Sequence, residues 1–207
     1  LPVPDGEPAG AVVDSGRGFA ALRLNEGCPY RCDYCASHML CPRFEAGDPH
    51  AAAAEVRRLA ESAGVRNFAF YDDALLVDRR RVFGEFLAHF AAGGTADSAA
   101  VGGAAGAGPG PPAPVPAVRF HLPNAVHMSH LNADIAGLMN RAGVQEVRLG
   151  FESDSDAFHA AHDAGAGPKA GRGGMAGGDG AALSAAVDAL LAGGFSRDRI
   201  GVYVLAG

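Results

Sequence analysis

The chain has 207 residues, and its 17 Lys and Arg against 23 Asp and Glu give a net charge of −6 at pH 7. That length suits one domain with a sizeable core, and the negative charge gives no overall reason to expect a nucleic acid or a membrane as partner. No apolar run reaches the roughly 18 residues that a membrane-spanning helix needs. Three of the four cysteines are clustered and the first residues lack the features of a secretory signal, so we expect a cytoplasmic location.

In chain order, short apolar runs predict strands and periodic stretches predict helices. Residues 1–17, rich in Pro, Gly and Asp, are predicted to be a linker, and residues 18–207 the folded core. Within the core we predict strand 19–24, helix 49–63, strand 67–71, helix 79–92, strand 118–122, helix 133–142, strand 146–151, helix 181–192 and strand 199–205. This alternation predicts an α/β fold with a parallel sheet and right-handed crossovers.

Capping residues mark several helix ends. Asp48 is the expected N-cap of the first helix, with Pro49 at its first position. Asp78 is a candidate cap of the second helix. Asn132 is the expected N-cap of the third helix, and Gly143 is expected to end it.

Two segments differ from the rest of the chain in composition. Residues 93–117 and 164–180 consist mainly of Gly and Ala, with several Pro in the first. They carry too little apolar surface to offset the entropy lost on ordering the chain. We therefore predict two low-complexity, disordered insertions.

Three cysteines lie within eight residues, as Cys28, Cys32 and Cys35 with the spacing C-x3-C-x2-C. Gly27 and Pro29 favour a loop, which would let the thiols approach one metal centre. The loop directly follows the first predicted strand, and in parallel α/β folds sites are built at the carboxyl ends of strands. Three thiolates are one fewer than a closed four-cysteine site needs, so the metal site is either incomplete or open at one corner.

With Tyr34 directly before the last cysteine, this motif resembles the signature of the radical S-adenosylmethionine (radical SAM) superfamily. The resemblance implies that the three cysteines hold three irons of a 4Fe-4S cluster, whose fourth iron binds the amino and carboxylate groups of S-adenosylmethionine (SAM). It implies a radical SAM enzyme, in which the reduced cluster cleaves SAM to a 5'-deoxyadenosyl radical. The cofactor supplies the hard chemistry, and the protein supplies binding and orientation.

The resemblance also implies a fold and partners. The family's core is a partial parallel (β/α) barrel of six strands. Five strands are visible here, so we expect a partial barrel that is truncated before its sixth strand. An electron donor such as flavodoxin or ferredoxin is implied as well, together with a substrate, small molecule or other, that the sequence does not identify.

The end of the second strand resembles a cofactor motif of the family. Many members have Gly-Gly-Glu there, which holds the methionine ammonium of SAM, whereas this chain has Asp72 and Asp73. An Asp-Asp pair resembles the members that accompany a cobalamin-binding domain, so cobalamin in a separate domain is left open as a further cofactor. A carboxylate has the right charge to face an ammonium. Either aspartate is our candidate, and the alternative is a solvated acidic pair before a helix.

Other positions resemble the family's SAM-binding residues. The candidates are Tyr34, Asn124, Glu152, Ser153, Leu205 and Gly207. Glu152 and Ser153, after the fourth strand, would bind the ribose or the methionine end of SAM. Leu205 and Gly207, after the fifth strand, would flank adenine. The asparagine after the third strand would line the pocket, and the tyrosine would pack beside the cluster or adenine. Glu152 and Asn124 are also residues that an ordinary turn contains.

Two alternatives stay open at this point. One is a non-catalytic zinc or iron–sulfur binding module that mediates a protein interaction, with a zinc site completed by Cys41 or a histidine; otherwise Cys41 is a pocket-lining or buried thiol. The other is a tRNA methylthiotransferase-like enzyme, which would need further cluster cysteines and an RNA-binding domain. The pairs His127 and His130, and His159 and His162, have metal-ligand spacing but are interpreted as surface residues of turns.

Overall fold

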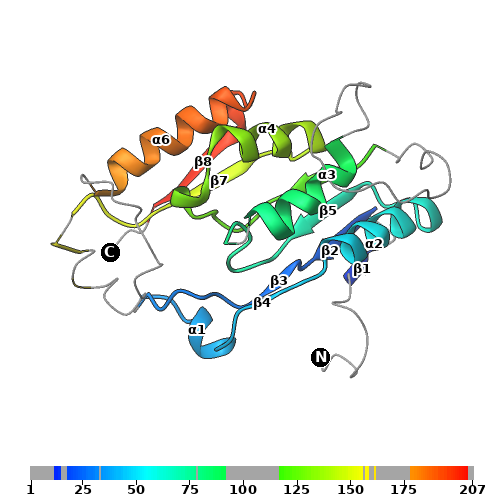
Figure 1. Ribbon diagram of the computed structural model, residues 1–207, viewed down its shortest axis with the longest axis horizontal. Coiled ribbons are helices and arrows are strands. Elements are labelled where there is room, and N and C mark those ends of the chain that lie inside the picture. The colour runs from blue at the N-terminus through cyan, green and yellow to red at the C-terminus, as the bar shows by residue number, and fades with distance from the viewer. Residues whose placement is uncertain are drawn as a thin grey trace, which may run out of the picture.

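The computed structural model describes residues 12–14, 18–32, 34–77, 79–91, 117–155, 157–158, 161 and 178–204. These residues form an α/β fold, in which a parallel sheet is covered by a row of helices (Figure 1). None of the described helices combines the length and the apolar character that crossing a membrane requires. Most of the two expected insertions, the candidate cap Asp78 and the chain end with Leu205 and Gly207 lie outside the described residues.

All five strands expected from the sequence are present, each slightly shorter than predicted. They are β2 (Phe19–Leu22), β5 (Asn67–Phe70), β6 (Arg119–His121), β7 (Val147–Phe151) and β8 (Ile200–Val204). Strands β2, β5 and β6 are parallel neighbours in one sheet, and β7 and β8 form a second parallel pair. Single bridges from Phe120 to Val144 and from Val126 to Leu149 connect the two groups. The parallel strands therefore succeed one another in chain order.

Helices fill the connections between these strands. They are α2 (Pro49–Ser62), a π-helical turn η1 (Arg79–Gly84) that runs into α3 (Glu85–Ala91), α4 (Ala133–Ala142) and α6 (Gly178–Ala192). Each of α2, α3, α4 and α6 contacts the next along the chain (Figure 1). Short 3₁₀ turns, η2 (Met128–His130) and η3 (Arg197–Arg199), complete the connections.

Two helix starts differ from the sequence prediction. The helix expected from residue 79 begins as the π-helical turn η1 and becomes α-helical at Glu85. Helix α6 begins at Gly178, inside the segment predicted to be disordered, because the side chain of Asp154 accepts a hydrogen bond from the backbone N–H of Gly180 at 3.0 Å. A capping bond from a distant residue offsets the low helix propensity of glycine, and local sequence does not reveal it.

The core lies between the sheet and the helix row, and aromatic side chains dominate its centre. Phe68, Phe70 and Phe120 project from the strands and are at most 2% exposed. Phe70 meets Phe86 of α3 edge-on, with ring centroids 5.2 Å apart, and Phe120 meets the same ring at 5.4 Å. Edge-to-face packing of large buried rings is strongly favourable. It gives the carboxyl edge of the sheet a rigid support.

The prediction that residues 1–17 form a linker is wrong for three of these residues. Val12–Asp14 form β1, which pairs antiparallel with β2, Val12 lying opposite Ala21. A strand of three residues is too short to show the alternation of apolar and polar side chains by which strands are predicted. Its backbone pairs with the edge of β2 instead, which satisfies hydrogen-bonding groups there that would otherwise be unpaired.

The caps of α2 and α4 agree with the sequence. Asp48 Oδ1 accepts hydrogen bonds from His50 N–H at 2.8 Å and Ala51 N–H at 3.2 Å. Asn132 Oδ1 accepts one from the backbone N–H of Ile135 at 2.9 Å, and Gly143 ends α4 in the left-handed conformation with φ +96°. These side chains satisfy backbone donors that the first helical turn leaves without partners.

The cap of α4 can be tested by substitution. Asn132→Ala should lower the free energy of unfolding by about 1 kcal/mol, because it removes the acceptor of the Ile135 N–H. Asn132→Ser retains a capping oxygen and should stay within a few tenths of a kcal/mol of the parent. Denaturant unfolding followed by circular dichroism measures both changes. Equal losses in the two variants would contradict the capping role.

Candidate functional site

The three clustered cysteines lie on a loop, residues 27–44, which leaves the carboxyl end of β2 and contains the short helix α1 (Ser37–Leu40) (Figure 1). A two-stranded ribbon of β3 (Asn25–Glu26) and β4 (Glu45–Ala46) closes the base of this cysteine loop. The backbone N–H of Gly47 also donates to the carbonyl of Leu24 at 3.0 Å. The loop therefore leaves and rejoins the domain at one point.

Gly27 allows the two sides of the loop base to approach closely. Its φ is +74°, and a Cβ at this position would lie 2.2 Å from the carbonyl oxygen of Arg43 and 3.1 Å from that of Cys41. A left-handed φ already disfavours other residues. Backbone atoms at such distances cannot move aside cheaply. Glycine is therefore required where the loop begins.

Asp72 connects the end of β5 to the beginning of the cysteine loop. Its side chain is buried, and its carboxylate accepts hydrogen bonds from the backbone N–H of Leu24, at 3.1 Å to Oδ1 and 3.0 Å to Oδ2, and from that of Asn25. Burial raises the pKa of Asp72 to about 6, although these hydrogen bonds act in the opposite direction. Asp73 is exposed. Of the two candidates for the SAM ammonium, the structure thus uses Asp72 at the loop base and leaves Asp73 accessible.

The cysteine thiols interact electrostatically with each other and with Asp73. Cys28 and Cys32 are half-buried, and Cys35 is exposed. Burial raises the pKa of Cys28 to about 11, and the negative potential of Cys32, Cys35 and Asp73 adds to the shift, while a hydrogen bond from the backbone N–H of Tyr30 lowers the pKa. The carboxyl end of β5 is thus close enough to the loop to influence its thiols.

The metal-binding capacity of this arrangement depends on the kind of centre. Among the residues that the structure describes, no three His, Cys, Asp or Glu side chains are placed to hold one metal ion together. In a cluster with several irons, each cysteine binds a different iron, so its thiolates do not converge on a single point. Three soft thiolates on one loop are a donor set that fits an iron–sulfur cluster.

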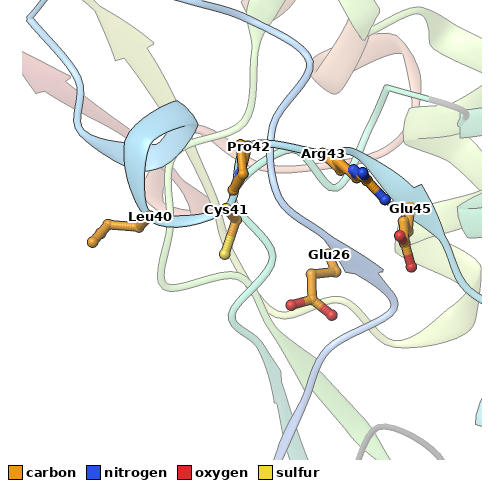
Figure 2. A pocket seen from close by; sticks show the side chains of 6 residues that line it. All are labelled: Glu26, Leu40, Cys41, Pro42, Arg43 and Glu45. Carbon is orange, nitrogen blue, oxygen red and sulfur yellow. The ribbon is translucent and has the colours of Figure 1, made fainter.

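Cys41 belongs to a different surface from the three motif cysteines. It lines a shallow pocket of about 260 Å³ on the loop base, together with Glu26, Leu40, Pro42, Arg43 and Glu45. Figure 2 shows its sulfur between Leu40 and the carboxylate of Glu26. Neither Cys28, Cys32 nor Cys35 lines this pocket. The interpretation of Cys41 as a pocket-lining thiol agrees with this position.

Tyr30 connects the cysteine loop to the segment after β6, a contact that the sequence analysis missed. Its phenol is hydrogen-bonded to Nε2 of His130, and its ring lies on that of His127 with centroids 5.0 Å apart. His127 is exposed and His130 half-buried, so the expectation of two surface histidines on a turn accounts for one of them. No local signal reveals a contact across 100 residues. The spacing of the two histidines is the only sequence feature that points to them.

The remaining candidates lie along the same edge. Asn124 Nδ2 donates to the backbone carbonyl of Asp72 at 3.1 Å, which joins the ends of β6 and β5. Glu152 and Ser153 follow β7 and are half-buried. Tyr34 is 40% exposed and stacks on Phe158, with ring centroids 6.0 Å apart. The positions of Leu205 and Gly207 lie outside the described residues.

Solved structures with a similar fold share one cofactor chemistry. TsrM from Kitasatospora setae is described as a radical S-adenosylmethionine methyltransferase. Its structure with cobalamin and a 4Fe-4S cluster has a TM-score of 0.65 over 90% of this chain and 31% of TsrM, at 18% identity. Its structure with tryptophan substrate and a SAM analogue has a TM-score of 0.62 over 90% and 30%, at 18% identity. OxsB, a cobalamin-dependent S-adenosylmethionine radical enzyme solved with aqua-cobalamin and SAM, has a TM-score of 0.54 over 89% and 23%, at 11% identity.

The described part of the chain has a fold related to that of TsrM and OxsB. This likeness of fold is consistent with the family resemblance given in the sequence analysis, and it agrees with the α/β fold expected from the sequence. Comparison of the sequence with family models and with curated proteins finds no match. The chain spans about a third of the length of TsrM.

Two glycines allow a matched test of the loop base. Gly27 and Gly18 both have positive φ, +74° and +62°, but a Cβ on Gly18 would meet no atom within 4 Å. Gly18→Ala should lower the free energy of unfolding by about 1 kcal/mol, from backbone strain alone. Gly27→Ala should lower it by about 2–4 kcal/mol, because steric overlap with the backbone of the opposite side is added. Equal losses in denaturant unfolding would show that the close approach has no energetic weight.

Asp72 predicts a pH dependence of stability. Its pKa is raised to about 6 from a usual value of 3.8, so the folded chain keeps this proton to a higher pH than the unfolded chain. The contribution of Asp72 to the free energy of unfolding should therefore fall as the pH rises from about 4 to about 6, and it should be constant above that range. Asp72→Asn keeps an acceptor oxygen and cannot ionise. It should remove this contribution, on the order of 2–3 kcal/mol.

Denaturant unfolding of the parent and of Asp72→Asn across this pH range measures the contribution of Asp72. The informative quantity is the difference between the parent and Asp72→Asn, since other titrating groups are common to both. Parallel curves would contradict the raised pKa.

Proposed function

We propose that this chain is the core of a radical SAM enzyme, in which Cys28, Cys32 and Cys35 hold a 4Fe-4S cluster and SAM completes it. The observation that carries the proposal is the position of the cysteine loop at the carboxyl edge of the parallel strands, within electrostatic reach of Asp73. Enzymes with the same fold have been solved with a 4Fe-4S cluster or with SAM bound.

The strand order supports a partial barrel as the framework of this enzyme. Parallel strands that follow one another in chain order, with helices in one row, are the arrangement of (β/α) barrels. The sheet face away from Phe68 and Phe70 carries small and polar side chains, including Ala21 and His121, which lie in the same row across β2, β5 and β6.

When bound, the cluster and SAM would supply the one-electron chemistry that generates a 5'-deoxyadenosyl radical. The protein's own residues would bind and orient them. The Cys28 thiol, whose pKa is raised by burial, must lose its proton on ligation, and iron stabilises the thiolate that forms. Cys32 and Cys35 would complete the set of three thiolates, so that one iron is left for SAM.

Five described residues would position SAM. The exposed carboxylate of Asp73 has the charge to hold the methionine ammonium. Glu152 and Ser153, half-buried after β7, would face the ribose or the amino-acid end. Asn124 is exposed at the end of β6 and fixed to the backbone of Asp72, so it would line the pocket wall. Tyr34 would cover the cluster or adenine, and Leu205 and Gly207 would flank adenine.

The proposal includes partners outside this chain. A reductant such as flavodoxin or ferredoxin would deliver the electron to the cluster in a cytoplasmic setting. Cobalamin, present in the TsrM and OxsB structures, would enter through a separate domain if it is used. The substrate is unidentified. No contact in the described residues specifically favours the non-catalytic module.

Anaerobic reconstitution with iron and sulfide tests the proposal. The parent and the control Cys41→Ser should bind about four irons per chain, since Cys41 lies in a separate pocket. Cys28→Ser, Cys32→Ser and Cys35→Ser should each lose at least about half of this iron, because each removes one thiolate ligand. After reduction, the electron paramagnetic resonance spectrum of the parent should change shape when SAM is added.

Three outcomes would contradict the proposal. Zinc in place of iron would favour a non-catalytic site. Equal iron loss in Cys41→Ser would reassign the ligands. A spectrum that is indifferent to SAM would leave a cluster without the cofactor site.

A further inference from the structure

We propose that the phenol of Tyr30 and the imidazole of His130 form a clamp that positions the cysteine loop. Tyr30 lies between Cys28 and Cys32, and its side chain is hydrogen-bonded to Nε2 of His130. His130 is a positioning residue in this account, because it acts on the thiols through Tyr30. The inference rests on the proposed function only where it concerns a bound cluster.

The clamp begins at the backbone of the loop. The N–H of Tyr30 donates a hydrogen bond to the sulfur of Cys28. Holding the Tyr30 ring restrains the position of its Cα, and therefore limits how far the adjoining peptide with this N–H can move. A further bond, from Cys35 N–H to the carbonyl of Cys32 at 3.0 Å, orders the turn that follows. Holding the phenol therefore restrains the loop between its first two cysteines.

The other side of the clamp is a firm support. His130 ends η2, and Met128 in the same turn is 7% exposed and belongs to the core. The N–H of His130 donates to the carbonyl of His127 at 3.1 Å, and Ser129 Oγ is 2.9 Å from Nδ1 of His127. These bonds hold the turn independently of the loop. The loop is thus attached to an element that is itself anchored.

Ring contacts and a hydrogen bond hold Tyr30, and they have different consequences. Its ring packs against His127 at 5.0 Å between centroids and stacks on His130 at 6.1 Å, and such contacts resist displacement but tolerate rotation. The hydrogen bond to His130 is directional and sets the orientation. Hydrogen bonds to cluster sulfurs are among the factors that set reduction potential. A loosened Tyr30 N–H would therefore alter the environment of the Cys28 sulfur.

Hydrogen exchange of the cluster-free chain gives the primary test. Tyr30→Phe keeps the stacked ring and removes the hydroxyl, and His130→Ala removes its partner. Tyr30→Phe should speed amide exchange in peptides covering residues 28–35 by about fivefold to tenfold, the effect of one lost hydrogen bond. His130→Ala should have at least this effect, because it also removes a ring that stacks on Tyr30 with centroids 6.1 Å apart. The double variant should match His130→Ala, in which the Tyr30 hydroxyl has already lost this partner.

Two controls separate the clamp from general damage. His130→Gln retains a polar group in reach of the phenol and should restore much of the protection. His89→Ala removes a histidine that is hydrogen-bonded to His50 at 2.9 Å, across α2 and α3, and should leave exchange in residues 28–35 unchanged. Circular dichroism of each variant checks that the domain is folded.

A second readout uses the reconstituted protein. Loss of iron to a chelator should be about fivefold to tenfold faster in Tyr30→Phe than in the parent. If the parent binds no cluster while the exchange pattern holds, the proposed function fails and the clamp stands. If exchange and iron loss are the same in Tyr30→Phe, His130→Ala and the parent, or if the effects of the two variants add, the clamp is overturned.

Discussion

The carboxylate of Asp72 is the interaction on which the geometry of the site depends. It is buried at the end of β5 and accepts the backbone N–H groups of Leu24 and Asn25, where the chain leaves β2. Two strand ends 47 residues apart are thereby fixed against each other. Burying a carboxylate without such donors is costly. The Asp72 carboxylate therefore depends on the backbone that leads into the cysteine loop, and that backbone depends on the carboxylate.

The rest of the site is built outward from this contact. Gly27 brings the two sides of the loop base together at the carbonyls of Cys41 and Arg43, and Tyr30 attaches the far part of the loop to η2. Asn124 binds the carbonyl of Asp72, so the third strand end joins the same network. The exposed cysteine loop, whose Met39 and Leu40 are largely in solvent, is held by these contacts to a rigid, aromatic core. This division suits a site that must be both accessible and ordered.

Sequence reasoning succeeded where the signal is local and periodic. Asp48 and Asn132 were identifiable as caps because a short polar side chain before an apolar periodicity has a direct physical role. Strand positions followed from apolar runs. The ribbon of β3 and β4 escaped prediction because two-residue strands have no period. Their pairing depends on the chain returning from residue 41 to residue 47, which no local pattern encodes.

The sequence around Asp72 and Asp73 contains part of the signal that distinguishes the two aspartates. From Phe70 onward burial alternates along the chain: Phe70 and Asp72 are buried, at 2% and 3% exposure, whereas Tyr71 and Asp73 are exposed. Alternation thus separates a structural aspartate from an accessible one. The contact of Tyr30 with His130 has no comparable signal, because a separation of 100 residues is set by the fold alone.

Burial and proximity give this edge of the sheet a consistent electrostatic character. The pKa of Cys28 is raised to about 11 and that of Asp72 to about 6, in both cases chiefly by burial. Cys32, Cys35 and Asp73 add negative potential at the Cys28 sulfur. A positively charged group bound here would lower these pKa values, and the interaction that lowers them would stabilise its binding to the same extent.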